Sequence, residues 1–221
     1  DLYYAMLVRS IGAPKGRFVL SAGSSPKAVV GFVDLDGDTG NSELFVSASS
    51  EAYPTDINAD NVKEDALVAA TNYLLVMKRT GAGVSASLLA GDGSLPSEPT
   101  AWDLTVAGAS GASIDTLKLV VNSGTLRIDE ISMASTFGSA VVNLTNAVPA
   151  TPEDAYDGFD YASSANLAAT SSGGTGWIDG WAADSGAGTS LTASGSGKSL
   201  FFGQSPGLIV DGSTHVWSES S

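Results

Sequence analysis

Acidic side chains recur at alternate positions in the segment DLDGDTGNSE, residues 34 to 43. Carboxylate and amide oxygens gathered in a turn are the ligands that a hard cation such as Ca²⁺ prefers. The segment departs from an EF-hand loop, because Thr39 stands where that loop has glycine and its twelfth position holds no glutamate. A solvated hairpin turn is the alternative interpretation. The candidate calcium ligands here are Asp34, Asp36, Asp38, Asn41 and Glu43.

A second acidic segment, TDINADNVKED at residues 55 to 65, has similar spacing. It offers Asp56, Asn58 and Asp60, with Asp65 at its end, and Asn61 again replaces the glycine of a calcium loop. The two segments are compatible with one shared ion or with two separate ions. If calcium binds, its removal by a chelator should lower the melting temperature.

Catalytic groups are scarce. Glycoside hydrolysis requires two carboxyl groups held at a defined separation, and the segment LRIDEIS offers only the adjacent Asp129 and Glu130. Adjacent residues of a strand point to opposite faces, so this pair does not form an acid and a nucleophile. The single histidine, His215, has no recognisable partner for a metal site or a triad. We therefore expect a protein that is not an enzyme.

Large aromatic residues offer a different chemistry, since their rings can stack on sugars. Core packing is the favoured interpretation, because aromatic residues dominate the cores of β-sandwiches. The candidates are Tyr3, Trp102, Trp177, Trp181 and Trp217.

Charge and composition exclude several partners. The chain of 221 residues has 24 acidic and 10 basic residues, a net charge of −14 that opposes binding to nucleic acid or anionic lipid. No cysteine is present, which excludes disulfides and cysteine-ligated zinc. No apolar run reaches the ~20 residues of a membrane helix. The chain begins at Asp1 with neither a methionine nor a signal peptide, so we expect a mature or excised product.

The elements that position these residues are predicted to be β-strands. Short runs rich in Val, Leu, Phe and Tyr alternate with Gly, Ser, Asp and Pro clusters. Residues 62 to 71 are compatible with a short helix or with a loop and strand. A break of alternation within residues 126 to 132 predicts a bulge or a sheet edge. The expected strands are residues 2–10, 16–22, 28–34, 42–48, 72–78, 84–90, 115–121, 126–132, 198–202, 207–210 and 214–218.

Two groups of motifs carry a family resemblance. NYLLVMKRT (72–80), GDGSLPSEPTAWD (91–103), SIDTLKLVV (113–121) and LRIDEISMASTFGSAV (126–141) resemble the closing half of LamG-like, concanavalin A-type jelly rolls of large secreted bacterial proteins. YDGFDYASSANLAATSSGGTGWIDGW (156–181), KSLFFG (198–203) and GLIVDGSTHVW (207–217) resemble the opening of such a domain. The resemblance covers nearly the whole chain in a circularly permuted order, residues 156–221 followed by 1–140.

The resemblance implies an all-β fold, a two-sheet antiparallel jelly-roll sandwich. Residues 1–140 would form the larger, C-terminal part of a jelly roll and residues 156–221 its N-terminal strands. Residues 141–155, with two prolines and no core pattern, are predicted to be a linker. Strands 156–221 of the same or a neighbouring chain would complete the sandwich.

The order of the halves leaves three arrangements open. Strands exchanged between identical subunits would build a head-to-tail fibre, since a heterologous contact that does not close into a ring propagates. The other two are adjacent repeats of a longer protein cut at an exposed loop, and a permuted domain that folds on itself. We therefore predict an extracellular or cell-surface, noncatalytic structural protein. The rival hypothesis is a carbohydrate-binding or adhesion module with glycans as partners.

Overall fold

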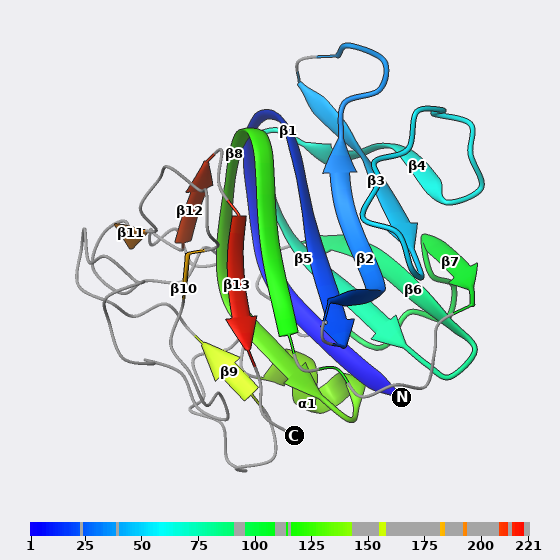
Figure 1. Cartoon of the computed structure of the whole chain (residues 1–221). Helices are drawn as coiled ribbons and strands as arrows, with labels where there is room; N and C mark the ends of the chain where they lie inside the picture. Colours follow the sequence, from blue (N-terminus) through cyan, green and yellow to red (C-terminus); the bar gives the residue numbers. More distant parts are fainter. Residues whose placement is uncertain are drawn as a thin grey trace.

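A computed structural model gives the arrangement of the chain (Figure 1). It describes residues 1–22, 24–38, 40–90, 96–108, 114 and 116–142, and the short strands within 155–157, 182–183, 192–193, 208–211 and 214–218. The predicted strand 198–202, most of the predicted linker, and Trp177 and Trp181 lie outside these residues.

Antiparallel strands dominate the described residues, as the sequence predicts, and one short helix, α1, accompanies them. The strands form one continuous sheet of 13 members over the described part of the chain. The elements are β1 (Leu2–Ala22), β2 (Ser25–Val33), β3 (Asn41–Ser47), β4 (Val62–Val68), β5 (Asn72–Arg79), β6 (Gly83–Ala90), β7 (Leu104–Ala107), β8 (Thr116–Ala134), α1 (Phe137–Val142), β9 (Ala155–Asp157), β10 (Ala182–Ala183), β11 (Thr192–Ala193), β12 (Leu208–Asp211) and β13 (Thr214–Ser218).

Two long strands, β1 and β8, run antiparallel to each other along almost their whole length. The first arm of β1, up to Ile11, also pairs with β5, whereas its second arm, from Gly16, pairs with β2. Both strands bend between these arms, and Figure 1 shows the arms diverging from the bend. Each strand therefore belongs to both halves of a nearly closed sheet.

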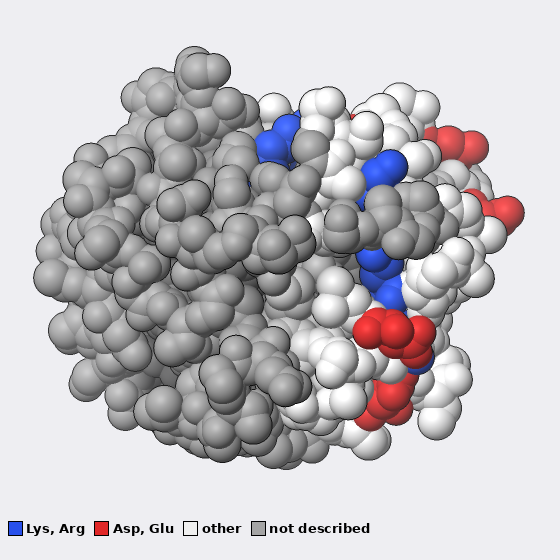
Figure 2. All heavy atoms as spheres, turned by 60° about the horizontal axis from the view of Figure 1, so that its bottom comes forward, with Lys and Arg blue, Asp and Glu red and all other residues white. Residues whose placement is uncertain are grey.

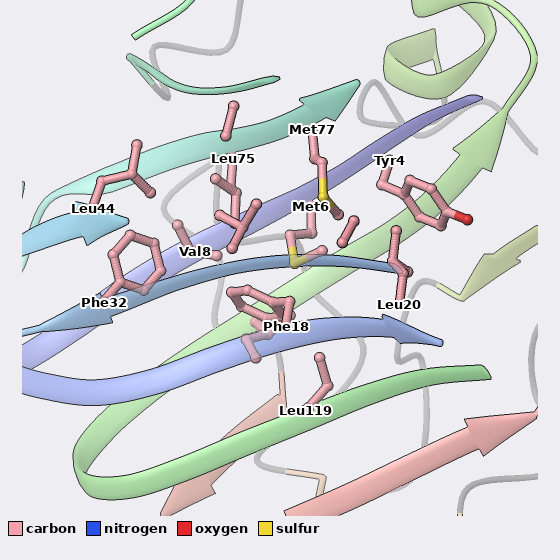
Figure 3. Close-up of a cluster of buried hydrophobic side chains, with 14 of the residues drawn as sticks. Tyr4, Met6, Val8, Phe18, Leu20, Phe32, Leu44, Leu75, Met77 and Leu119 are labelled. Carbon is pink, nitrogen blue, oxygen red and sulfur yellow. The ribbon is translucent and has the colours of Figure 1, made fainter. Parts of the chain in front are cut away.

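The core lies between the two halves. Tyr4, Met6 and Val8 on the first arm of β1 and Phe18 and Leu20 on its second arm belong to one buried cluster. Figure 3 shows these side chains pointing toward one another, together with residues of β2, β3, β5 and β8. Full burial of each large apolar side chain contributes roughly 1.5–3 kcal/mol, so this cluster holds the halves together.

Both outer faces of the sheet are also covered. Tyr3 and Leu7 form a second cluster with Phe137 of α1, which packs on the first half. On the second half, Val33 and Phe45 lie beneath a group of partly buried residues, Leu35, Tyr53 and Val62. Because both faces are buried, the strands read as nearly continuous apolar runs.

The sequence of β8 contains the predicted irregularity. Leu126 and Ile128 face the core, and after one extra residue Ile131 and Met133 face it as well. The register of β8 against β1 shifts at this point, opposite Ala5 and Leu7. The phase break predicted for residues 126 to 132 is therefore confirmed as a β-bulge.

The free edge of β8 receives the described C-terminal strands. β13 pairs with residues 116–120 of β8, β12 with residues 125–128 and β9 with residues 131–133. β8 thus lies between β1 and these three strands.

Candidate metal centre

The hairpin loop between β2 and β3 is shaped by its own aspartates. Asp34 Oδ1 accepts a hydrogen bond from the amide of Gly37 at 2.7 Å, and Asp36 Oδ1 accepts one from the amide of Asp38 at 2.9 Å. Asp38 Oδ1 accepts another from the amide of Gly40 at 2.9 Å. Gly37 has a φ of 84°, which its missing side chain permits. These side-chain turns fix the loop and hold its carboxylates in place.

Glu43 is the buried member of the site. It pairs with Val33 across β2 and β3 and shares that residue's outer face, where it is only 1% exposed. Its Oε2 accepts a hydrogen bond from the amide of Leu35 at 2.8 Å. Burial raises the pKa of Glu43 above its ordinary value, and the charges of Asp36 and Asp34 add to this effect against the lowering by backbone hydrogen bonds.

Asp65 reaches the same place from the neighbouring strand β4. Its backbone has a φ of 48°, a left-handed conformation that breaks the alternation of the strand. Asn41 links the two segments, since its Nδ2 donates to Asp38 Oδ2 at 3.1 Å and to Asp65 Oδ1 at 3.2 Å. Asp65 is therefore held against the hairpin loop.

Three carboxylates meet at this point. One oxygen from each of Asp36, Glu43 and Asp65 lies within 4.8 Å of the other two. Among the described residues, no lysine or arginine forms an ion pair with any of the three. A bound cation would neutralise their mutual repulsion, and oxygen ligands suit a hard metal ion. This acidic triad could hold a metal ion.

The predicted ligands divide into three groups. Asp36 and Glu43 belong to the triad, while Asp34, Asp38 and Asn41 form the hydrogen-bond network around it. The structure does not bring Asp56, Asn58 and Asp60 into the triad.

These last three residues belong to a separate turn of the second acidic segment. Asp56 Oδ1 accepts a hydrogen bond from the amide of Asn58 at 2.9 Å, as in a solvated turn. The segment contributes Asp65 instead, which lies on β4. Asn61, between the turn and β4, ties the chain to β3. The Nδ2 of Asn61 donates to the carbonyl of Val46 at 2.9 Å.

Of the aromatic candidates, Tyr3 and Trp102 have side chains that the structure describes, and both are packed. Tyr3 is 5% exposed, and its ring contacts Phe137 edge-on at 6.1 Å between centroids. Its hydroxyl donates to Glu98 Oε1 at 2.9 Å. Trp102 packs against the same outer cluster. The interpretation as packing residues holds for Tyr3, whose ring has no free face for a sugar.

Fold and site together define an all-β protein with a nearly closed antiparallel sheet and an acidic triad on one outer face. Comparison with known protein families, with curated proteins and with solved structures gave no match to this chain. None of the described helical residues form a helix long and apolar enough to cross a membrane.

Proposed function

We propose that this protein is a noncatalytic, extracellular structural subunit with a LamG-like jelly roll, assembled head-to-tail into a fibre by strand exchange. The observation that carries the proposal is the pairing along β8. One edge of this 19-residue strand pairs with β1, and the other receives β9, β12 and β13 from beyond residue 142.

The pairing contacts are the same whichever chain supplies the C-terminal strands. Leu208 lies opposite Ile128 and Trp217 opposite Leu117, both within regular antiparallel register. Strand addition to an open edge gains backbone hydrogen bonds regardless of chain identity. Without a donated strand, the edge of β8 would leave its backbone groups unpaired.

The predicted linker is long enough for exchange. Fifteen residues extended at ~3.3 Å each span about 50 Å, and a globule of this chain length has a diameter of roughly 45 Å. A neighbouring subunit is therefore within reach, and an exchange that does not close into a ring propagates as a filament.

Engineered disulfides test the exchange, because the native chain has no cysteine. Asp211 and Thr125 are directly opposite each other in β12 and β8, at a separation that suits a disulfide. If strands exchange between chains, the double variant Asp211→Cys, Thr125→Cys should give a ladder of covalent multimers on a nonreducing denaturing gel. A mixture of the two single variants should give heterodimers.

A mismatched pair provides the control. Thr116 lies opposite Ser218 rather than Asp211, so the double variant Asp211→Cys, Thr116→Cys should not form the ladder. A gel that shows only monomers with an internal disulfide would contradict exchange and support a domain that folds on itself.

We also propose that the ion of the acidic triad is calcium. Support comes from the all-oxygen donor set of Asp36, Glu43 and Asp65 in a chain of net charge −14. After chelator treatment, added calcium should raise the melting temperature. At a hundredfold excess of calcium over its Kd, the free energy of unfolding should rise by about 2.7 kcal/mol. Asp65→Asn should abolish this rise, and Asp60→Asn, in the separate turn, should preserve it. An equal rise in both variants would contradict the site.

The carbohydrate-binding alternative has less support. A lectin presents aromatic faces beside a polar groove, whereas Tyr3 is buried and Trp102 packs beside it.

A further inference from the structure

A basic cluster lies on the outer face of the second half of the sheet. Arg17 comes from the second arm of β1, Lys15 from the bend just before that arm, and Lys118 from β8. Lys118 pairs with Val19, and paired residues share a face, so its side chain lies beside the outer cluster that contains Val19. These are three of the ten basic residues of the chain. On the face drawn in Figure 2, the Lys and Arg of the described residues stand in small groups, with Asp and Glu nearby.

One carboxylate serves two of these cations. Glu51 Oε2 lies 3.3 Å from Arg17 Nη2 and 2.8 Å from Lys118 Nζ. The side chains of Arg17, Lys118 and Glu51 are 15%, 23% and 27% exposed, so the group is partly shielded from water but reachable. Electrostatic attraction is stronger in such a partly buried setting than on an open surface.

Tyr53 organises the rest of the cluster. Lys15 Nζ lies 4.6 Å and Arg17 Cζ 4.7 Å from the centroid of its ring, within the range of cation–π attraction. Its hydroxyl donates to Asn122 Oδ1 at 2.6 Å, and Arg17 Nη1 donates to the same oxygen at 3.2 Å. Burial raises the pKa of Tyr53 above its ordinary value of 10.0, so this hydroxyl is protonated at neutral pH and well above it.

Donors exceed acceptors in this arrangement. Lys15 has no carboxylate within 4.0 Å among the described residues. Arg17 Nε is buried and has no hydrogen-bond partner in the described structure. Among the described residues, three cations face the single carboxylate Glu51, which gives this group a net charge of +2 (3 − 1) in a chain whose overall net charge is −14.

We propose that Lys15, Arg17 and Lys118 bind a phosphate group. A phosphate dianion matches the net charge of the cluster, and its several acceptor oxygens can use donors from more than one cation. A carboxylate brings a single negative charge, as Glu51 already does, and would leave one positive charge unbalanced. The phosphate is a free ion or part of a polymer, and this site is independent of strand exchange and of the acidic triad.

Isothermal titration with inorganic phosphate tests the site, at pH 8, low ionic strength and without divalent cations. We expect Lys15→Gln and Lys118→Gln each to weaken binding roughly tenfold, which corresponds to about 1.4 kcal/mol. Lys27→Gln removes the same charge from β2 and should change the affinity less than about twofold. Absence of binding, or an equal loss in Lys27→Gln, would overturn the proposal, because the latter indicates diffuse attraction.

Two further measurements define the ligand. Sulfate carries the same charge at pH 8 and at pH 6, whereas phosphate gains a proton between them, so acidification should weaken only phosphate. Loss of binding by both ions at pH 6 would contradict a dianion site. The second measurement compares linear polyphosphate with inorganic phosphate. If polyphosphate binds more tightly, and Lys118→Gln weakens its binding as much as that of phosphate, the ligand is a phosphate group of a polymer. If the two bind with equal affinity, the ligand is the free ion. Melting curves of each variant confirm that it folds.

Discussion

Glu43 shows how one residue can cost stability and still be useful. Its carboxylate is 1% exposed and close to Asp36 and Asp65, and among the described residues it forms no ion pair. A charge in this position loses solvation and is repelled by its neighbours, which explains its raised pKa. A bound cation would convert the same repulsion into attraction.

The pH dependence follows from the direction of this shift. Because the folded pKa of Glu43 lies above the ordinary value of 4.5, the charged form destabilises the fold at neutral pH. The penalty shrinks as pH falls through the folded pKa and vanishes below the ordinary value. Without divalent cations, Glu43→Gln should therefore be more stable than the native protein at pH 7, by on the order of 1 kcal/mol. This advantage should disappear below about pH 4.

Urea unfolding between pH 4 and pH 8 in the presence of a chelator measures this difference. Glu64→Gln is the matched control, since it removes the same charge from an exposed position on β4. A Glu43→Gln protein that is less stable than the native protein at pH 7 would contradict this expectation, since the charge of the carboxylate would then gain more from its backbone hydrogen bonds than it loses by burial and repulsion.

The spacing of acidic residues predicts part of the triad. The sequence predicts Asp36 and Glu43 as ligands because oxygen ligands recur in one turn. Asp65 stood in the second segment, but its place beside them depends on a left-handed backbone within a strand. Prediction from alternating residues assumes regular strands, so it cannot predict that the Asp65 side chain turns toward the hairpin loop. Asp56 showed the same spacing and instead stabilises a local turn.

At the scale of elements, apolar runs predict where most strands lie but not where they end. The sequence predicts separate strands at residues 2–10 and 16–22, because Gly12 and Pro14 are typical turn residues. The structure continues β1 through them, with Gly12 at a φ of 73°. A similar bend in β8 contains Gly124, at a φ of 72°.

The bends of β1 and β8 pack against each other, which explains why position 124 is a glycine. A Cβ on Gly124 would lie 2.7 Å from the Cα of Pro14. This contact between residues 110 positions apart depends on the tertiary fold, so local propensity cannot predict it. Likewise, residues 62 to 71 were compatible with a helix, and pairing of β4 with β3 makes residues 62 to 68 a strand. The strand β7 and the helix α1 were also not predicted.

At the scale of the whole molecule, the sheet is nearly closed. The strand β4 lies at one end of the sheet, and side chains link it to the half that contains β5, β6 and β7. Lys63 Nζ on β4 lies 2.6 Å from Asp103 Oδ1, just before β7. Asp103 Oδ2 also accepts a hydrogen bond from the amide of Leu88 on β6 at 2.9 Å. Nearby, the Val68 amide donates to the Tyr73 hydroxyl at 3.4 Å. We name this line of contacts, through Lys63, Asp103, Leu88, Val68 and Tyr73, the seam.

Asp103 should contribute more to the seam than its ion pair suggests. The Lys63 side chain is 43% exposed, and ion pairs of exposed groups contribute little, so Lys63→Ala should cost less than about 1 kcal/mol. Asp103→Ala leaves the half-buried Leu88 amide without its acceptor, a loss of about 1–3 kcal/mol. Urea unfolding gives both values, and hydrogen exchange at the Leu88 amide should accelerate only in Asp103→Ala. Equal losses in the two variants would mean that the ion pair, rather than the amide contact, holds the two halves of the sheet together at the seam.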